Sequence, residues 1–230
     1  SSDTEITKIL KELNIALSVD EVKKIQFSFL NRPATLTELV LFSIQGSEHS
    51  SYKSSKNHIK HFLTDGDHVI LGAKDDAGVV SLSVDNNGNR YGLVVSHESH
   101  NHPSQIVPYE GAATGVGGNV RDVCCMGAEV MSLGDSLRFG DIDRNKTKWI
   151  SDGVVSGIAG YGNPLGIPNI CGDLYFDKEY NENCLVTVLT AGVVKEKNVI
   201  RSKAPKNSVN YDLILVGKPT DNSGFGGASF

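Results

Sequence analysis

The spacing of apolar residues changes near residue 60, and this change restricts the fold more than any other feature of the chain. Before that point the apolar residues recur at helical intervals, as in Ile6, Ile9 and Leu13. After it, short runs rich in valine and leucine alternate with helical patterns. Interleaved strands and helices predict an α+β fold of mixed α/β type.

Residues 1–60 are predicted to form a helical amino-terminal segment. The pairs Ser18 with Glu21 and Thr35 with Glu38 have the spacing of capping boxes, which begin helices. Residues 47–63 predict a loop followed by a helix with lysine side chains.

Residues 61–195 are predicted to form one sheet-containing domain, and residues 196–230 a connection followed by the first part of another domain. Asn87-Gly88 lies between two apolar runs and predicts a hairpin turn. Helices are expected at 120–126 and 150–158, and the strands are expected at 69–71, 79–82, 91–95, 130–133, 174–176, 185–194 and 213–216.

Composition excludes several classes of protein. The formal net charge of −5 argues against a nucleic-acid scaffold or a basic membrane-surface protein. No apolar run approaches the roughly 20 residues that span a bilayer, and the polar start of the chain does not have the layout of a signal peptide. The four cysteines fit neither a disulfide framework nor a zinc pattern. They are interpreted as buried thiols in a cytoplasmic protein.

The segment Ser96-His97-Glu98-Ser99-His100-Asn101-His102-Pro103 is the most unusual of the chain. In an extended conformation Glu98, His100 and His102 would share one face. A carboxylate and two imidazoles there suit a metal site or a base beside one. The alternative is a polar strand end whose histidines bond to backbone. The spacing does not match a zinc protease, whose two helical histidines lie four residues apart.

Glycines are concentrated in Gly111–Gly118, directly before Arg121 and Asp122. A glycine loop before a helix exposes backbone amides to an anion, and the helix dipole favours negative charge there. Arg121 is then a phosphate ligand and Asp122 a magnesium ligand. Close packing of a helix on the sheet explains the glycines equally well.

Residues 47–56 contain His49, Tyr52, Lys53 and Lys56 within ten positions. Such a stretch suits a phosphorylated substrate, although by composition a solvated helix start is the better interpretation. A second glycine loop, at residues 220–230, runs into apolar residues where the sequence stops. This ending predicts that the chain is a fragment.

Six ordered motifs together resemble the synthetase of the formylglycinamide ribonucleotide amidotransferase family (phosphoribosylformylglycinamidine synthase). They are Ser47–Lys56, Glu98–Ser104, Pro108–Asp122, Asp135–Gly140, Tyr161–Pro164 and Gly226–Phe230. The resemblance implies a sheet-and-helix domain of the PurM/PurL amino-terminal type at 61–195, which binds ATP and Mg²⁺. It covers nearly the whole chain but only the amino-terminal part of a much longer enzyme.

In this family ATP phosphorylates the amide oxygen of formylglycinamide ribonucleotide, and ammonia then displaces phosphate to give formylglycinamidine ribonucleotide. The resemblance implies glutamine as the ammonia source, through a partner glutaminase, and in some members a small bridging subunit. An amide carbon is a poor electrophile, so phosphorylation of its oxygen supplies a leaving group, and magnesium offsets the developing charge.

The site residues follow from the motifs, position by position. The resemblance implies that His49 and His100 are catalytic, His100 as the proton acceptor. It implies metal ligands at Glu98 and Asp122, and nucleotide contacts at Tyr52 and at position 96. The implied substrate-binding residues are Ser99, His100, Asn101, His102 and Arg121.

Three positions depart from the family pattern. Ser96 stands where a nucleotide-binding lysine is usual, and Gly46 and Ser50 stand where Trp and Cys are frequent. The loss of the lysine removes a cation from the nucleotide phosphates, which supports a non-catalytic nucleotide-binding or assembly subunit as a rival interpretation. A sister enzyme (aminoimidazole ribonucleotide or selenophosphate synthetase) and a metallohydrolase are two further rival interpretations.

Two further expectations follow from the resemblance. Residues 1–230 alone should be inactive, because later substrate, metal and nucleotide residues of the family are absent. The sheet of the amino-terminal domain should pair with a related domain, and without one the chain should self-associate or expose an apolar sheet face.

Overall fold

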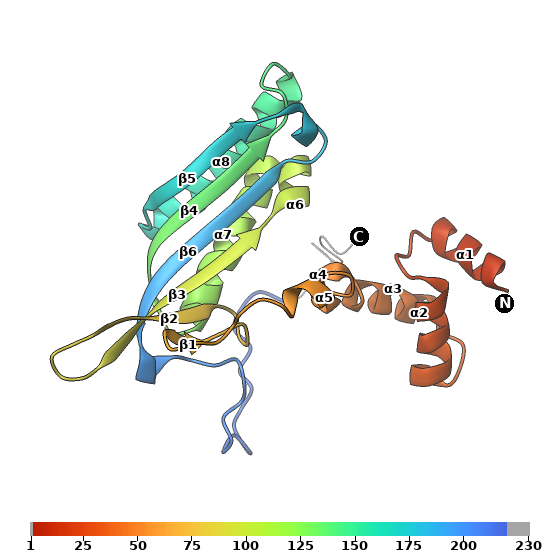
Figure 1. Ribbon diagram of the computed structural model, residues 1–230. Helices are drawn as coiled ribbons and strands as arrows, with labels where there is room; N and C mark the ends of the chain where they lie inside the picture. The colour runs from red at the N-terminus through yellow and green to blue at the C-terminus, as the bar shows by residue number, and fades with distance from the viewer. Residues whose placement is uncertain (1, 220–230) are drawn as a thin grey trace. The chain divides into compact units, whose positions relative to one another are not determined.

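The computed structural model describes residues 2–219, and the chain divides into two compact units. One contains residues 1–62 together with 214–230, and the other contains residues 63–213. Each unit is described by itself (Figure 1). The second glycine loop, at 220–230, lies outside the described residues.

The first unit is helical, as predicted. Its elements are α1 (Asp3–Glu12), α2 (Val19–Lys24), the π-helical turn η1 (Ile25–Leu30), α3 (Leu36–Gln45), α4 (Glu48–Ser51) and α5 (Lys56–Ile59). Both capping boxes are confirmed: Ser18 and Glu21 begin α2, and Thr35 and Glu38 begin α3. Each box satisfies two amide donors that the first turn of a helix leaves without partners.

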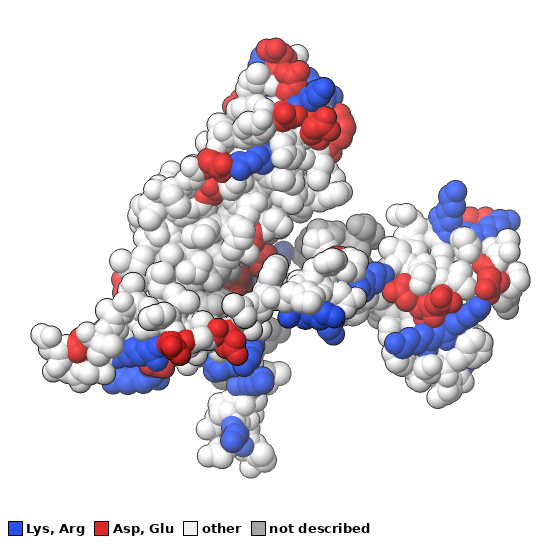
Figure 2. Space-filling model, viewed as in Figure 1, with Lys and Arg blue, Asp and Glu red and all other residues white. Residues whose placement is uncertain are grey.

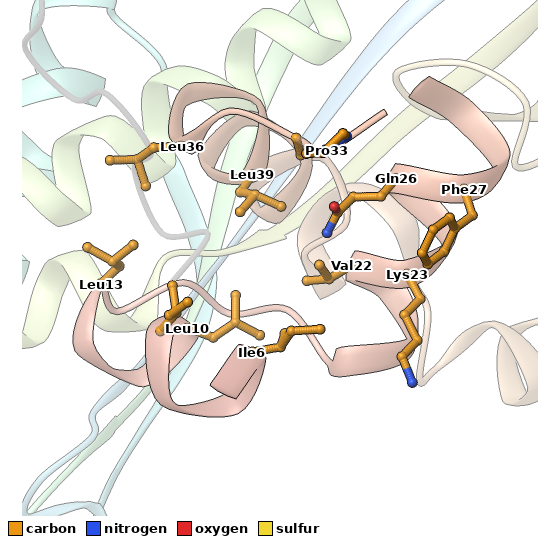
Figure 3. Close-up of a pocket in the computed structure, with 12 residues that line it drawn as sticks. Ile6, Leu10, Leu13, Val22, Lys23, Gln26, Phe27, Pro33, Leu36 and Leu39 are labelled. Carbon is orange, nitrogen blue, oxygen red and sulfur yellow. The ribbon is translucent and has the colours of Figure 1, made fainter. Parts of the chain in front are cut away.

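An open apolar groove of about 440 Å³ separates α1, α2 and α3 (Figure 3). Ile6, Leu10 and Leu13 line one side, and Leu36 and Leu39 line the other. Among the described residues of this unit, the buried cluster comprises Leu10, Ile15 and Val22, and Ile6, Leu17, Leu39 and Val40 pack against it.

The second unit is a six-stranded sheet in the order β1-β2-β3-β6-β4-β5, with α6, α7 and α8 on one face (Figure 1). Only β4 and β5 pair in parallel, joined by α8, whereas the other neighbours are antiparallel. The bounds are β1 (Val69–Leu71), β2 (Gly78–Val84), β3 (Arg90–Ser99), α6 (Asn101–Ile106), α7 (Pro108–Cys125), β4 (Glu129–Phe139), α8 (Asn145–Leu165), β5 (Asn169–Phe176), η2 (Lys178–Tyr180), β6 (Leu185–Lys195) and η3 (Glu196–Asn198).

The predicted mixed fold is confirmed. In β6 the alternation of side chains that predicts a strand corresponds to alternating burial. Its residues alternate between buried and half-buried, with Val186, Val188 and Val194 turned to the helices. Val186 and Val188 belong to a core cluster with residues of α7, α8 and β4. Val194 belongs to a second cluster, with residues of β1, β2, β3 and the end of α7. The strand expected at 213–216 is absent, since residues 211–216 have no regular structure.

The glycine-rich stretch Gly111–Gly118 is not a loop, so that prediction is wrong. It lies inside α7, where Gly111 touches the backbone of Ser104 and Gly117 touches the ring of Tyr161. Glycine costs about 1 kcal/mol per residue in a helix, but here it lets α7 approach α6 and α8 closely. Close packing, the second explanation of these glycines, is the one observed, with helices rather than the sheet as neighbours.

The interpretation of the cysteines as buried thiols is also wrong for three of them. Cys124, Cys125 and Cys171 are exposed, and only Cys184 is buried. Burial raises the pKa of the Cys184 thiol to about 11. No helix within residues 2–219 has the length and apolar character needed to cross a membrane.

Candidate functional site

In the helical unit, His49 and Tyr52 lie on a turn that one carboxylate holds together. Glu48 accepts hydrogen bonds from the amides of Ser54 (2.8 Å) and Ser55 (3.0 Å) and from both serine hydroxyls. Tyr52 takes a left-handed conformation (φ 50°) and is 53% exposed, and His49 is exposed as well. The loop expected here is thus two short helical turns around Glu48, with both predicted side chains open to a ligand.

Replacing Glu48 by glutamine should loosen this turn. A glutamine amide keeps one acceptor oxygen, so the hydrogen bonds to the carboxylate oxygen that becomes the amide nitrogen are lost. We therefore expect the backbone amides of Ser54 and Ser55 to exchange hydrogen at least about fivefold faster. Exchange measured by NMR or mass spectrometry at pH 7 tests this. Glu38→Gln is the matched control, because it disturbs the cap of α3 and the ion pair with Arg32 but makes no bond to Ser54 or Ser55. Equal exchange in both variants would contradict the role of Glu48.

The pH dependence of the turn follows from the same bonds. The hydroxyl and amide donors of Ser54 and Ser55 lower the pKa of Glu48 to about 2, from an ordinary value of 4.5. A carboxyl whose pKa is depressed on folding stabilises fully above its unfolded value and loses that contribution as the pH falls through its folded value. Slow exchange at Ser54 and Ser55 should therefore persist from pH 7 to below pH 4.5 and end near pH 2.

In the sheet unit, β3 and α7 bring the predicted carboxylates to one face. The Ser96 hydroxyl donates to Asp122 Oδ2 at 3.0 Å, so the side chain of Ser96 points to α7. Glu98, two residues further along β3, projects from the same face about 6.6 Å away along the strand. Glu98 and Asp122 therefore lie on the same side of the sheet, the side that α7 covers.

The electrostatics around Asp122 favour a cation. Burial raises the pKa of Asp122; the Ser96 hydrogen bond acts in the opposite direction, and the negative charge of Asp76 raises the pKa further. The helix also contributes. Because α7 begins at Pro108, Asp122 lies in its last turn, where the dipole attracts cations. The prediction that a helix amino terminus faces an anion at Arg121 and Asp122 is therefore wrong.

The predicted substrate-binding run is divided between a strand and a helix. The strand β3 ends at Ser99, and α6 begins at Asn101, so the extended conformation expected through His102 is wrong. Pro103 sits inside the first turn of α6, where a missing amide hydrogen costs nothing. Consequently Glu98, His100 and His102 do not form one strand face.

His100 lies at this junction and is half-buried against α7. Its amide donates to the carbonyl of Val186 at 2.7 Å, and Gly115 leaves room for its ring. Nδ1 is buried and has no partner among the described residues. Burial lowers the pKa of the imidazole, partly offset by the Gly111 backbone. The ring is therefore neutral at pH 7, the form that accepts a proton.

The other predicted residues differ in how far they are free to bind a ligand. The Asn101 side chain accepts the amide of Val186 at 2.8 Å and so connects α6 to β6. Ser99, His102 and Arg121 are exposed. Ser96 is 5% exposed and its hydroxyl is engaged. The binding roles of these residues stay predictions.

Sequence reasoning missed Glu48 in the helical unit, and Asp76 and Asn119 in the sheet unit. The adjacent acids Asp75-Asp76 were a signal for one of them. The Asp75 side chain is buried and bonds to Ser202 and Arg201, which leaves Asp76 to act on Asp122. Nothing local marks Asn119, because its partner Ser96 lies 23 residues away on β3. The partners of Glu48 are Ser54 and Ser55, six and seven residues away, but the sequence pattern did not reveal this turn.

Magnesium fits the donors around Asp122. In residues 2–219 no group of three or more His, Cys, Asp or Glu side chains could enclose a metal ion. Mg²⁺ does not need such a cage, since it is usually held by one or two carboxylates together with water and substrate phosphates. Glu98 and Asp122 are two such carboxylates on one face.

Comparison with known proteins gives the family. Residues 74–194 match "AIR synthase related protein, N-terminal domain", which is more than half of the chain. The chain belongs to this family. Residues 6–53 match "Formylglycinamide ribonucleotide amidotransferase linker domain". The resemblance drawn from the motifs is thereby confirmed, with the linker match in the helical unit and the AIR synthase match in the sheet unit.

Individual relatives agree with this assignment. Phosphoribosylformylglycinamidine synthase subunit PurL of Methanothrix thermoacetophila is 48% identical over 100% of this chain and 30% of its own length. The structure of T. maritima PurL complexed with ADP has a TM-score of 0.66 and 38% identity over 80% of this chain and 28% of that one. T. maritima PurL complexed with FGAR has a TM-score of 0.65 and 37% identity, covering 82% and 28%. The chain thus spans about 30% of the length of the curated relative.

Proposed function

We propose that this chain supplies the amino-terminal part of an ATP-dependent ligase that converts formylglycinamide ribonucleotide to formylglycinamidine ribonucleotide in purine biosynthesis. The observation that carries the proposal is the placement of Glu98 and Asp122 on one face, directed by the Ser96 bond. The relatives support it, since the T. maritima PurL structures are complexes with FGAR, ATP and ADP.

The carboxylates would hold Mg²⁺. When bound, the ion would offset the negative charge of the transferring phosphoryl group. Asp122 would present one oxygen to it while Ser96 holds the other, and Glu98 would approach from β3. Arg121, exposed on α7 beside Asp122, would bind the substrate, and its guanidinium matches phosphate geometry.

The imidazole of His100 would serve as the proton acceptor. Burial lowers its pKa, which keeps the ring neutral at pH 7. Ser99, Asn101 and His102 would bind the substrate around it, on the strand-to-helix junction. In the helical unit, His49 would be the second catalytic residue and Tyr52 a nucleotide contact, both on the turn held by Glu48.

The partners belong to the proposal as well. A glutaminase would release ammonia from glutamine, and a small bridging subunit would assist it in a cytoplasmic complex. Physically, phosphorylation of the amide oxygen makes the carbon open to attack by ammonia, so the ammonia must arrive where water is excluded.

Turnover tests the proposal directly. The protein expressed from the complete open reading frame should form formylglycinamidine ribonucleotide, ADP and phosphate from formylglycinamide ribonucleotide, ATP, Mg²⁺ and ammonia. Residues 1–230 alone should give no product. Turnover of aminoimidazole ribonucleotide precursor or of selenide instead would favour a sister enzyme, and absence of Mg²⁺-dependent nucleotide binding would favour a non-catalytic subunit.

A related proposal concerns the sheet face opposite the helices. Leu93, Val95, Leu189 and Val193 are only half-buried there. Few Lys, Arg, Asp or Glu side chains interrupt this face, since most lie at its two ends (Figure 2). An apolar sheet face of this kind suits a second sheet of the same type. Sedimentation of residues 1–230 should show self-association, and a monomer that binds no hydrophobic dye would contradict it.

A further inference from the structure

Polar side chains interrupt the apolar layer between α7 and the sheet. Ser96 is 5% exposed, and Asn119 and Thr190 are 0% exposed. Ser96 and Thr190 lie directly opposite each other on β3 and β6, so their side chains share the face that α7 covers. Buried valines surround the group, among them Val120 and Val123 on α7. The cluster is therefore part of the core and not of the surface.

The hydrogen bonds of this cluster run in one direction. Asn119 Nδ2 donates to Ser96 Oγ at 3.0 Å, and Ser96 Oγ lies 3.0 Å from Asp122 Oδ2. An amide nitrogen can only donate and an ionised carboxylate can only accept, so the single hydroxyl hydrogen of Ser96 must point to Asp122. Asn119 and Asp122 are three residues apart on α7 and thus lie on the same side of the helix.

The cluster is costly for stability. Asn119 Oδ1 and Thr190 Oγ1 are buried and have no partner among the described residues. A buried polar atom without a partner has lost its hydrogen bonds to water, and apolar side chains of the same shape would avoid that cost. A polar group kept in a core at this expense, and bonded to a carboxylate, indicates a role other than stability.

We propose that Ser96, held in place by Asn119, is a positioning residue that fixes the carboxylate of Asp122 for a divalent cation. This inference rests on the function proposed above and adds two residues to it. Ser96 donates to Oδ2, which leaves Oδ1 as the oxygen that would bind the cation. Ser96 acts through Asp122 and does not itself touch the nucleotide phosphates.

The experiment measures binding without turnover. Protein from the complete open reading frame is titrated with Mg²⁺ in the presence of the analogue AMPPCP, and binding is followed by calorimetry. Ser96→Ala should raise the Mg²⁺ concentration at half-saturation about tenfold, as expected when a partner of a metal ligand is removed. AMPPCP binding without Mg²⁺ should not change. Ser96→Thr keeps the hydroxyl and should restore the wild-type Mg²⁺ midpoint.

Thr190→Val is the matched control. It changes the same buried cluster but removes a hydroxyl that takes no part in the hydrogen bonds from Asn119 to Ser96 and from Ser96 to Asp122. The Mg²⁺ midpoint should therefore stay within about twofold of wild type. Its melting temperature should rise, because a buried hydroxyl without a partner is removed. Melting curves of all variants show whether each one is folded. A Thr190→Val shift equal to that of Ser96→Ala would mean that the cluster acts only as packing, and would overturn the proposal.

Three other results would overturn it, and they differ in what else they affect. If Ser96→Ala leaves the Mg²⁺ midpoint unchanged while Asp122→Asn abolishes Mg²⁺-dependent binding, Ser96 does not position Asp122, and the proposed function stands. The same holds if Ser96→Ala weakens AMPPCP equally with and without Mg²⁺, since Ser96 then contacts the nucleotide directly. If Asp122→Asn also keeps Mg²⁺-dependent binding, Asp122 is not a metal ligand, and the positioning role of Ser96 is excluded with it.

Discussion

Replacing Asp122 by asparagine should lower kcat/KM of the proposed amidation about 10³-fold. The substitution removes a negative charge from the cation site, and a metal ion contributes several kcal/mol to charge stabilisation in such reactions. Folding should survive, because the amide oxygen of asparagine still accepts the Ser96 hydroxyl. Steady-state kinetics with varied Mg²⁺ on the protein from the complete open reading frame measures the effect.

Asp173→Asn is the control for this experiment. Asp173 is also a carboxylate of the sheet unit, but its partner is Arg138, at 2.7 Å on the neighbouring strand. Loss of this solvent-screened ion pair should change stability little and leave kcat/KM close to that of the wild type. Activity of Asp122→Asn within tenfold of wild type would show that Asp122 is not a metal ligand.

Replacing Gly157 by alanine should destabilise the sheet unit by about 3 kcal/mol. Gly157 lies in α8 where it crosses α7, and an added Cβ would overlap the carbonyl oxygen of Tyr109 and lie 3.1 Å from the amide nitrogen of Ala113. Both are backbone atoms, so the helices must separate. Thermal unfolding followed by circular dichroism should show a melting temperature lower by roughly 6–12 °C.

Gly118→Ala is the matched control for the helix interface. Gly118 is also a helical glycine, but nothing lies within 4 Å of the Cβ it would gain. This substitution should stabilise the protein by about 0.5–1 kcal/mol, since alanine is the better helix former. If both glycines responded alike, helix propensity and not close packing would explain the glycines of α7 and α8.

Features stabilised by neighbours in sequence could be predicted. The capping boxes at Ser18 and Thr35 depend on contacts three residues apart, and both are present. The turn at Asn87-Gly88 and the alternation of β6 are equally local, so the hairpin and this strand were predicted. The motifs were sufficient for the family, because ordered strings of residues are a property of sequence alone.

Features that depend on distant neighbours were predicted wrongly or missed. Residues 111–118 have the composition of a loop, yet contacts with α6 and α8 keep them helical. Similarly, β3 stops at Ser99 because Asn101 bonds to Val186, which is 85 residues away. Asn119 could not be identified from the sequence as a neighbour of Asp122 and Ser96, since its partner Ser96 lies 23 residues away on β3.

The sequence by itself determined most of the helical and sheet segments, and the family. The tertiary structure alone decided that Ser96 and Asp122 are partners and that Glu98 shares their face. The physical reason is that periodicity and capping are set by residues within one or two turns. The orientation of the Asp122 side chain and the charges around it depend on elements that meet only after the chain has folded, as α7 and β3 do here.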